Sequence, residues 1–90
     1  MRDHLFRALA DPTRRKIVEL LAVKDRTAGE LAEEFPIAFA SVSHHLGVLK
    51  NAGLVAVERE GQHMRYRLNT TVFQDMARYL VKTFSGGTDA

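Results

Sequence analysis

The side chains with the greatest capacity for chemistry stand together in the segment S-V-S-H-H at residues 41–45. A hydroxyl beside an imidazole can form a nucleophile and its base, and two histidines can bind a transition metal. Neighbouring helical residues point about 100° apart, however, and groups that act together on one helix need a spacing of three or four. No carboxylate lies nearby in the sequence to orient His44 or His45 as a base. The segment therefore predicts neither an enzyme nor a metal site, and no cofactor is expected.

The same segment suits contact with a nucleic acid when it is placed on a helix. We expect a helix over about 39–52, in which Val42, Leu46 and Leu49 recur at helical spacing and are buried, with His45 as a structural residue at the packing seam. The opposite face has no carboxylate and offers small residues, hydroxyls and an imidazole, so it can approach a DNA groove closely. An ordinary solvent-exposed face is the alternative. The candidate DNA contacts on this helix are Phe39, Ala40, Ser41, Ser43, His44 and Lys50.

A basic hairpin is expected directly after this helix. Gly53 can end the helix, and residues 54–60 and 63–68 alternate in strand fashion around a Gly61-Gln62 turn. One face of the second strand is apolar and the other is basic, so the ribbon can lie on the core while presenting cations to a minor groove or to phosphates. The candidate DNA contacts on the hairpin are Arg59, His63, Arg65 and Arg67.

The balance of charge favours the same region. Between Ala38 and Asn69 the chain has four Lys and Arg against two Glu, and this excess of +2 equals that of the whole chain, with 13 Lys and Arg against 11 Asp and Glu. Lys and Arg that neutralise phosphates drive DNA affinity, so a local excess on a balanced chain indicates a DNA-binding face. The excess is small, and many soluble domains carry as much. A second basic run, Arg14-Arg15-Lys16, is either a solvated face or a phosphate contact.

Three helices are predicted ahead of the helix that carries the histidines. Asp11-Pro12 is a start signal, because Asp accepts hydrogen bonds from free N–H groups and Pro suits the first helical position. Thr27 and Glu30 have the spacing of a capping box. Pro36 disfavours helical geometry at Phe35 and marks a turn between two helices. The three helices are expected over about 3–9, 12–22 and 28–34.

A last helix is predicted over about 71–84, and apolar residues cover more of it than one core-facing stripe needs. Either this helix is sandwiched within the domain or it pairs with a second subunit. We favour a homodimer, because a chain of 90 residues has a thin core for its surface. Residues 85–90 are expected to form a flexible tail. The predicted dimer interface consists of Leu5, Phe6, Leu9, Phe73, Met76, Tyr79, Leu80 and Phe84.

These elements predict one domain over residues 1–84, mainly α with a small β-hairpin, arranged as a winged helix-turn-helix. The chain has no cysteine and no apolar run long enough to cross a bilayer, so we expect a cytoplasmic protein without membrane insertion. Its expected partners are double-stranded DNA and a second copy of itself. The alternative is a winged helix that binds proteins without sequence-specific DNA binding. Uncompensated cations in the hairpin argue against that alternative.

Three motifs in this order give the chain a family resemblance. A-L-A-D-P-T-R-R-K-I-V-E-L-L at 8–21, S-V-S-H-H-L-G-V-L at 41–49 and A-G-L-V at 52–55 resemble the ArsR family of bacterial winged-helix repressors. The resemblance implies a homodimeric repressor that dimerises through its terminal helices and binds an inverted-repeat operator. The chain is similar in particular to small autorepressors of sporulation-delaying immunity operons, which share D-P-T-R-R-K-I, S-H-H-L and L-N-T-T-V. That similarity implies a further partner, an anti-repressor protein.

The chain departs from the metal-sensing members of this family. Where relatives that sense arsenic and lead carry paired cysteines, this chain has Thr27 and Gly29, which cannot bind a soft metal. Ala38 cannot cap the helix that follows it, and Phe39 and Ala40 replace polar residues common in relatives, so base contacts there are fewer or apolar. The resemblance therefore implies a repressor without a metal effector. The positions that match zinc and cobalt ligands of other relatives are Asn69, Thr71, Lys82 and Ser85.

Overall fold

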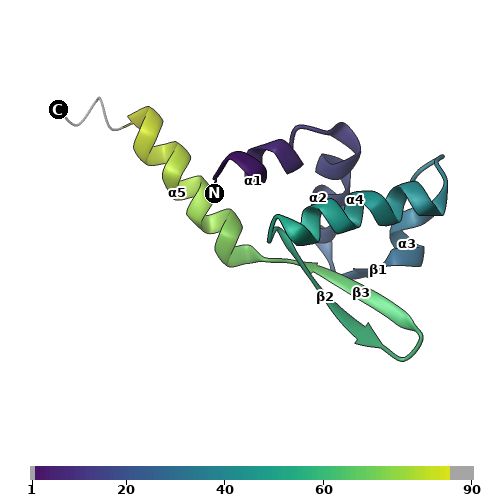
Figure 1. Ribbon diagram of the computed structural model, residues 1–90. Helices are drawn as coiled ribbons and strands as arrows, with labels where there is room; N and C mark the ends of the chain where they lie inside the picture. Colours follow the sequence, from purple (N-terminus) through teal and green to yellow (C-terminus); the bar gives the residue numbers. More distant parts are fainter. Residues whose placement is uncertain (1, 86–90) are drawn as a thin grey trace.

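The computed structural model describes residues 2–85, which form helices and a small antiparallel sheet (Figure 1). The predicted tail at 86–90 lies outside the described residues, and Ser85, which we expected in that tail, is the last residue of the final helix. The elements are α1 (Arg2–Ala8), α2 (Pro12–Val23), β1 (Arg26–Thr27), α3 (Ala28–Ala32), α4 (Phe39–Asn51), β2 (Val55–Glu60), β3 (His63–Leu68) and α5 (Thr70–Ser85).

The helix starts are confirmed by their caps. The Asp11 carboxylate accepts from the Arg14 N–H at 3.1 Å at the start of α2. At α3, the Thr27 hydroxyl accepts from the Glu30 N–H at 3.1 Å, and the Glu30 carboxylate accepts from the Thr27 N–H at 2.8 Å. These backbone N–H groups hold the pKa of both the Asp11 and the Glu30 carboxyls below their usual values. The two caps thus fix where α2 and α3 begin.

The third helix is shorter than we predicted. It ends at Ala32, two residues before Glu34, because the chain tightens there into hydrogen bonds between residues three apart. The Glu34 N–H donates to the Leu31 carbonyl and the Phe35 N–H to the Ala32 carbonyl. Pro36 then follows, as expected for a turn. The segment α3, turn and α4 forms the helix-turn-helix.

The sheet has one strand more than the predicted hairpin. Its order is β1-β3-β2, and the two-residue strand β1 pairs with β3 through Arg26 opposite Tyr66 and Thr27 opposite Arg65. Two residues are too few to show an alternating pattern in a sequence, so the prediction missed this strand. The hairpin itself is confirmed, and Gly61 in its turn has a φ of +64°.

One apolar core joins the helices to the sheet. It confirms the predicted stripe of α4, since Val42, Leu46 and Leu49 are buried. Ile17 and Leu21 of α2 complete its centre. The other members are Ala8, Leu31, Leu54, Val55 and Met76.

Two elements extend away from this core. Beyond its first turns α5 projects from the domain, and β2 and β3 project in another direction as a wing (Figure 1). The radius of gyration is 14.7 Å, whereas a compact domain of 90 residues has about 12 Å. Both projecting elements therefore expose surface that the domain itself does not cover.

Candidate nucleic-acid interface

The exposed face of α4 presents two rows of side chains. Phe39 and Ser43 are four residues apart, as are Ala40 and His44, so each pair lies on one side of the helix one turn apart. All four side chains are exposed, as predicted. Ala38 provides no side-chain hydrogen bond to the start of the helix, which confirms the missing cap. This end of α4 offers small, apolar and hydrogen-bonding groups without a charge.

Two predicted contacts of α4 lie apart from this end. Ser41 is exposed but sits on the opposite flank, four residues before the half-buried His45. Lys50 is exposed on the flank of Ser43, about two turns further along the helix. A surface that contacts the tip of α4 therefore reaches Phe39, Ser43 and His44 together more readily than it reaches Ser41 or Lys50.

Two residues of the basic run at the start of α2, Arg14 and Arg15, donate hydrogen bonds to groups within the domain. The Arg14 guanidinium donates to the Ala8 carbonyl at 2.6 Å and to His45 Nδ1 at 3.2 Å. Arg15 donates to the carbonyls of Leu9 and Ala10. The Arg14 contacts tie the end of α1 to α4, so Arg14 is a structural residue, whereas the side chains of Arg15 and Lys16 are exposed.

His45 is a structural histidine, as expected. Its Nδ1 accepts from Arg14, which can only donate, and lies 3.8 Å from the Asp11 carboxylate. Among residues 2–85, no three His, Cys, Asp or Glu side chains are grouped so that they could hold a metal ion. The neighbouring His44 is exposed and remains available to a partner at the surface.

The register of the wing divides its cations between two faces. Directly opposite residues of an antiparallel pair have their side chains on the same face. Arg59 lies opposite Met64, whereas Arg65 lies opposite Glu58. Since side chains alternate along a strand, Arg59 is on the face away from the other two wing arginines. The opposite face carries Glu58, Glu60, His63, Arg65 and Arg67.

Carboxylates compensate two of the three wing arginines, which corrects our expectation of uncompensated cations. Arg65 Nε lies 3.1 Å from Glu60 Oε2, and Arg67 Nη1 lies 3.7 Å from Glu58 Oε2. The hydrogen bond that Arg65 donates to the Glu60 carboxylate raises the pKa of Arg65 above its usual value. Arg59 instead donates to the Gly61 carbonyl at 3.2 Å, and among residues 2–85 no carboxylate lies within ion-pair distance of its guanidinium. The net positive charge of the wing is therefore concentrated at Arg59.

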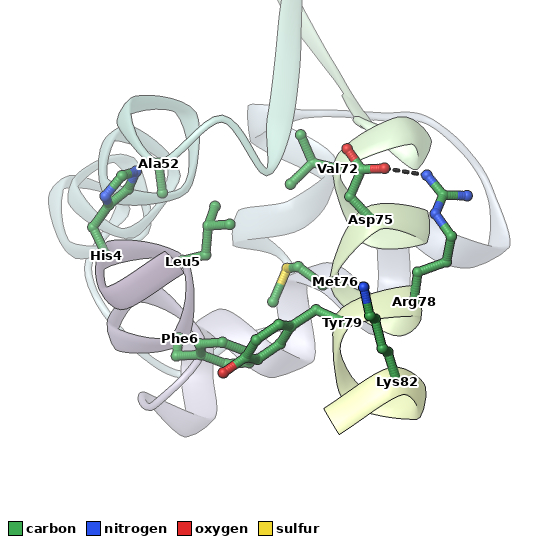
Figure 2. Close-up of a pocket in the computed structure, with 10 residues that line it drawn as sticks. All are labelled: His4, Leu5, Phe6, Ala52, Val72, Asp75, Met76, Arg78, Tyr79 and Lys82. Atoms are coloured by element: carbon green, nitrogen blue, oxygen red, sulfur yellow. Dashed lines mark hydrogen bonds and ion pairs between the residues drawn. The ribbon is translucent and has the colours of Figure 1, made fainter. Parts of the chain in front are cut away.

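A groove of about 600 Å³ separates α1 from α5. Figure 2 shows Leu5 and Phe6 on one side and Met76 and Tyr79 on the other, with their side chains directed toward one another. The rings of Phe6 and Tyr79 have centroids 6.1 Å apart. Charged residues of α5, including Lys82, line the rim. The sides of α1 and α5 that face each other across this groove are thus largely apolar.

The predicted interface residues fall into two groups. Met76 is 7% exposed and belongs to the core, with Leu5, Leu9 and Phe73 packed against it, so these four mainly stabilise the domain itself. The other four leave apolar surface uncovered, most of all Phe84 at 79% exposed. Val81, which we had not included, is exposed as well. The exposed predicted members are Phe6 and Leu80, together with Phe84 and the half-buried Tyr79.

Two of the residues that match metal ligands of relatives, Thr27 and Asn69, have structural partners. Thr27 caps α3. The Asn69 side chain donates to the Gly53 carbonyl at 3.0 Å and accepts from the Val72 N–H at 3.4 Å, so it joins the end of α4 to the start of α5.

Over the part of the chain described here, no helix has the length and apolar character needed to span a bilayer.

Comparison with known proteins supports the interpretation of this geometry. Residues 11–57, which include the helix-turn-helix, match the family described as bacterial regulatory protein, arsR family. Transcriptional repressor SdpR of Bacillus subtilis is 46% identical over 85 residues, which cover 94% of each chain.

Two solved structures have the same fold. A crystal structure of an ArsR family transcriptional regulator superposes with a TM-score of 0.87 at 26% identity, covering 98% of this chain and 91% of that one. A solution structure of a homodimeric winged helix-turn-helix DNA-binding domain from Mycobacterium bovis, a possible ArsR-family regulator, gives a TM-score of 0.76 at 28% identity, with 98% and 82% covered. The matched family, SdpR and the first of these two structures are named as transcriptional regulators or repressors, and none of them is named as an enzyme. The chain belongs to the ArsR family of bacterial regulatory proteins.

Proposed function

We propose that the protein represses transcription in the cytoplasm by binding an inverted-repeat operator as a homodimer, with one α4 in the major groove of each half-site. The observation that carries this proposal is the uncharged, exposed face of α4 within a helix-turn-helix. Helix-turn-helix proteins place this second helix in the major groove, and a dimer spaces its half-sites about one helical turn, roughly 34 Å, apart.

The dimer is supported by the surface of the terminal helices. Phe6, Leu80, Val81 and Phe84 are large apolar side chains left exposed by a single copy, and the first of these borders the groove between α1 and α5. Apolar patches of this kind mark protein interfaces. The relative from Mycobacterium bovis is described as a homodimer, and the same arrangement is proposed here.

Within this proposal, α4 reads bases and the wing holds phosphates. His44 and Ser43 can donate and accept hydrogen bonds at base edges, whereas the wing cation without a carboxylate partner, Arg59, suits a phosphate. Replacing His44 by Ala should reduce the preference for the operator over random DNA by about 1–3 kcal/mol, with little change in the salt dependence of binding. Arg59→Ala should instead weaken binding to all sequences alike.

The proposal includes no metal effector. Thr27 and Asn69 at the sensor positions are bound within the domain, and Lys82 repels cations. Release of the operator is then assigned to an anti-repressor protein. Titration of zinc, nickel or arsenite into the operator complex should leave its affinity unchanged beyond the effect of ionic strength. Release at stoichiometric metal would overturn this part of the proposal.

Selection of bound fragments from random DNA, followed by footprinting, tests the function itself. We expect enrichment of an inverted repeat that the protein protects in both halves. The alternative function, a winged helix that binds only proteins, predicts no enrichment over the starting pool. That result would refute DNA recognition whatever the oligomeric state.

A further inference from the structure

The start of α4 carries an apolar surface that the core does not use. Ile37, Ala38, Phe39 and Ala40, here called the apolar tip, are all exposed, and Phe39 is 55% exposed. Phe39 is also absent from the residues that pack against the core. No Asp, Glu, Lys or Arg occurs from Phe35 to Leu49. Burial in the core therefore does not explain why an aromatic residue stands at position 39.

The apolar tip lies on the same face of α4 as Ser43 and His44, which are proposed to contact bases. Phe39 lies one turn before Ser43 on the same side of α4, and Ala40 lies one turn before His44. The tip is also remote from the dimer surface, because α4 begins beside α3 at the end of the domain opposite α5 (Figure 1). A second copy that covers α1 and α5 therefore leaves Phe39 exposed.

The major groove offers an apolar group that the apolar tip could contact. Thymine is the base that presents a methyl group there, at C5, and Phe and Ala side chains contact it. We propose that Phe39, with Ala40 beside it, packs against a thymine methyl group in each half-site and so makes the protein select thymine at one position. This inference rests on the proposed function, since it requires α4 to enter the major groove.

Deoxyuridine provides the sharpest test, because it removes the C5 methyl group and keeps base pairing unchanged. Each thymine of the selected operator is replaced in turn, symmetrically in both half-sites, and the affinity is measured by fluorescence anisotropy. Burial of one such carbon is worth about 0.8 kcal/mol, or roughly fourfold in affinity, so we expect a loss of about sixteenfold for the pair at one position. Thymines outside the half-sites should be insensitive and serve as controls.

Phe39→Ala shows whether this residue senses the methyl group. The variant should bind the thymine operator more weakly and should lose most of the difference between thymine and deoxyuridine. His44→Ala is the matched control from the same face, and it should keep that difference while losing other base preferences. Phe39 is exposed, so we expect the variant to fold, and its circular dichroism checks this.

Four outcomes would overturn the inference while leaving DNA recognition intact. The first is that the selected half-sites contain no fixed thymine. The second is that no deoxyuridine substitution weakens binding. The third is that the loss of affinity on deoxyuridine substitution is as large in Phe39→Ala as in the unaltered protein. A Phe39→Ala variant that keeps full affinity for every operator would likewise refute the inference. Failure to select any sequence would refute the proposed function and this inference together.

Discussion

The carboxylates of the wing should weaken DNA binding, and removal of one of them tests this directly. Glu58 is exposed and lies 3.7 Å from Arg67, so its charge offsets that of the arginine. Each phosphate that a protein cation neutralises contributes about 0.9 to the slope of log affinity against log salt. Glu58→Gln should therefore steepen the slope by up to about 0.9, because it leaves Arg67 free to neutralise a phosphate. Affinity should rise at low salt and converge with the unaltered protein at high salt.

The arginines should respond unequally in the same assay. Arg59→Ala should flatten the slope by about 0.9, whereas Arg67→Ala should change it much less, because the charge of Arg67 is already offset. Fluorescence anisotropy with the operator and with random DNA between about 0.05 and 0.3 M salt gives the slopes. Ala56→Gln, opposite Arg67 in the register, is a control that adds an amide on the same face without changing charge. Equal losses for Arg59→Ala and Arg67→Ala, with no effect of Glu58→Gln, would refute the reasoning.

Three further predictions concern assembly and stability. Leu80→Asp with Phe84→Asp should give a folded monomer by analytical ultracentrifugation, because both side chains are exposed in one copy; a persistent dimer would contradict the proposed interface. Thr27→Ala should lower the free energy of unfolding in urea by about 1 kcal/mol through loss of the cap, and Thr27→Ser should restore it; equal stability of all three proteins would show that the cap is dispensable. The pKa of Glu30 is lowered in the folded state, so its carboxylate contributes to the free energy of unfolding above the unfolded pKa of about 4. This contribution is lost as the pH falls through the folded pKa, so Glu30→Gln should make the acid-induced loss of stability shallower. An unchanged dependence of stability on pH would argue against this linkage.

Local signals in the sequence were sufficient for most of the fold. Asp11-Pro12 and the Thr27 capping box depend on neighbouring residues only, and both helices begin where these signals place them. The apolar spacing of α4 likewise identified its buried face, because burial there follows from helical period. The two-residue strand β1 could not be predicted in this way, since its pairing with β3 is a long-range contact.

The candidate site was predicted less completely, because side-chain partners come from the fold. In the sequence, Arg14 is one of three consecutive basic residues. Its hydrogen bonds to Ala8 and His45 depend on how α1 and α4 lie in the fold, so the sequence did not predict them. The opposing faces of Arg59 and Arg65 were accessible from the sequence, because a turn at Gly61-Gln62 fixes the register of the strands. The net charge of the hairpin does not show which residues share a face, so it did not predict the ion pairs of Arg65 with Glu60 and of Arg67 with Glu58.

The affinity for a re-spaced operator shows whether two copies hold paired α4 helices in successive major grooves. Insertion of five base pairs between the half-sites turns one of them by about half a helical turn, to the far side of the duplex. If both helices must be seated at once, the affinity should fall to that of a single half-site. Undiminished affinity for the re-spaced operator would contradict this arrangement.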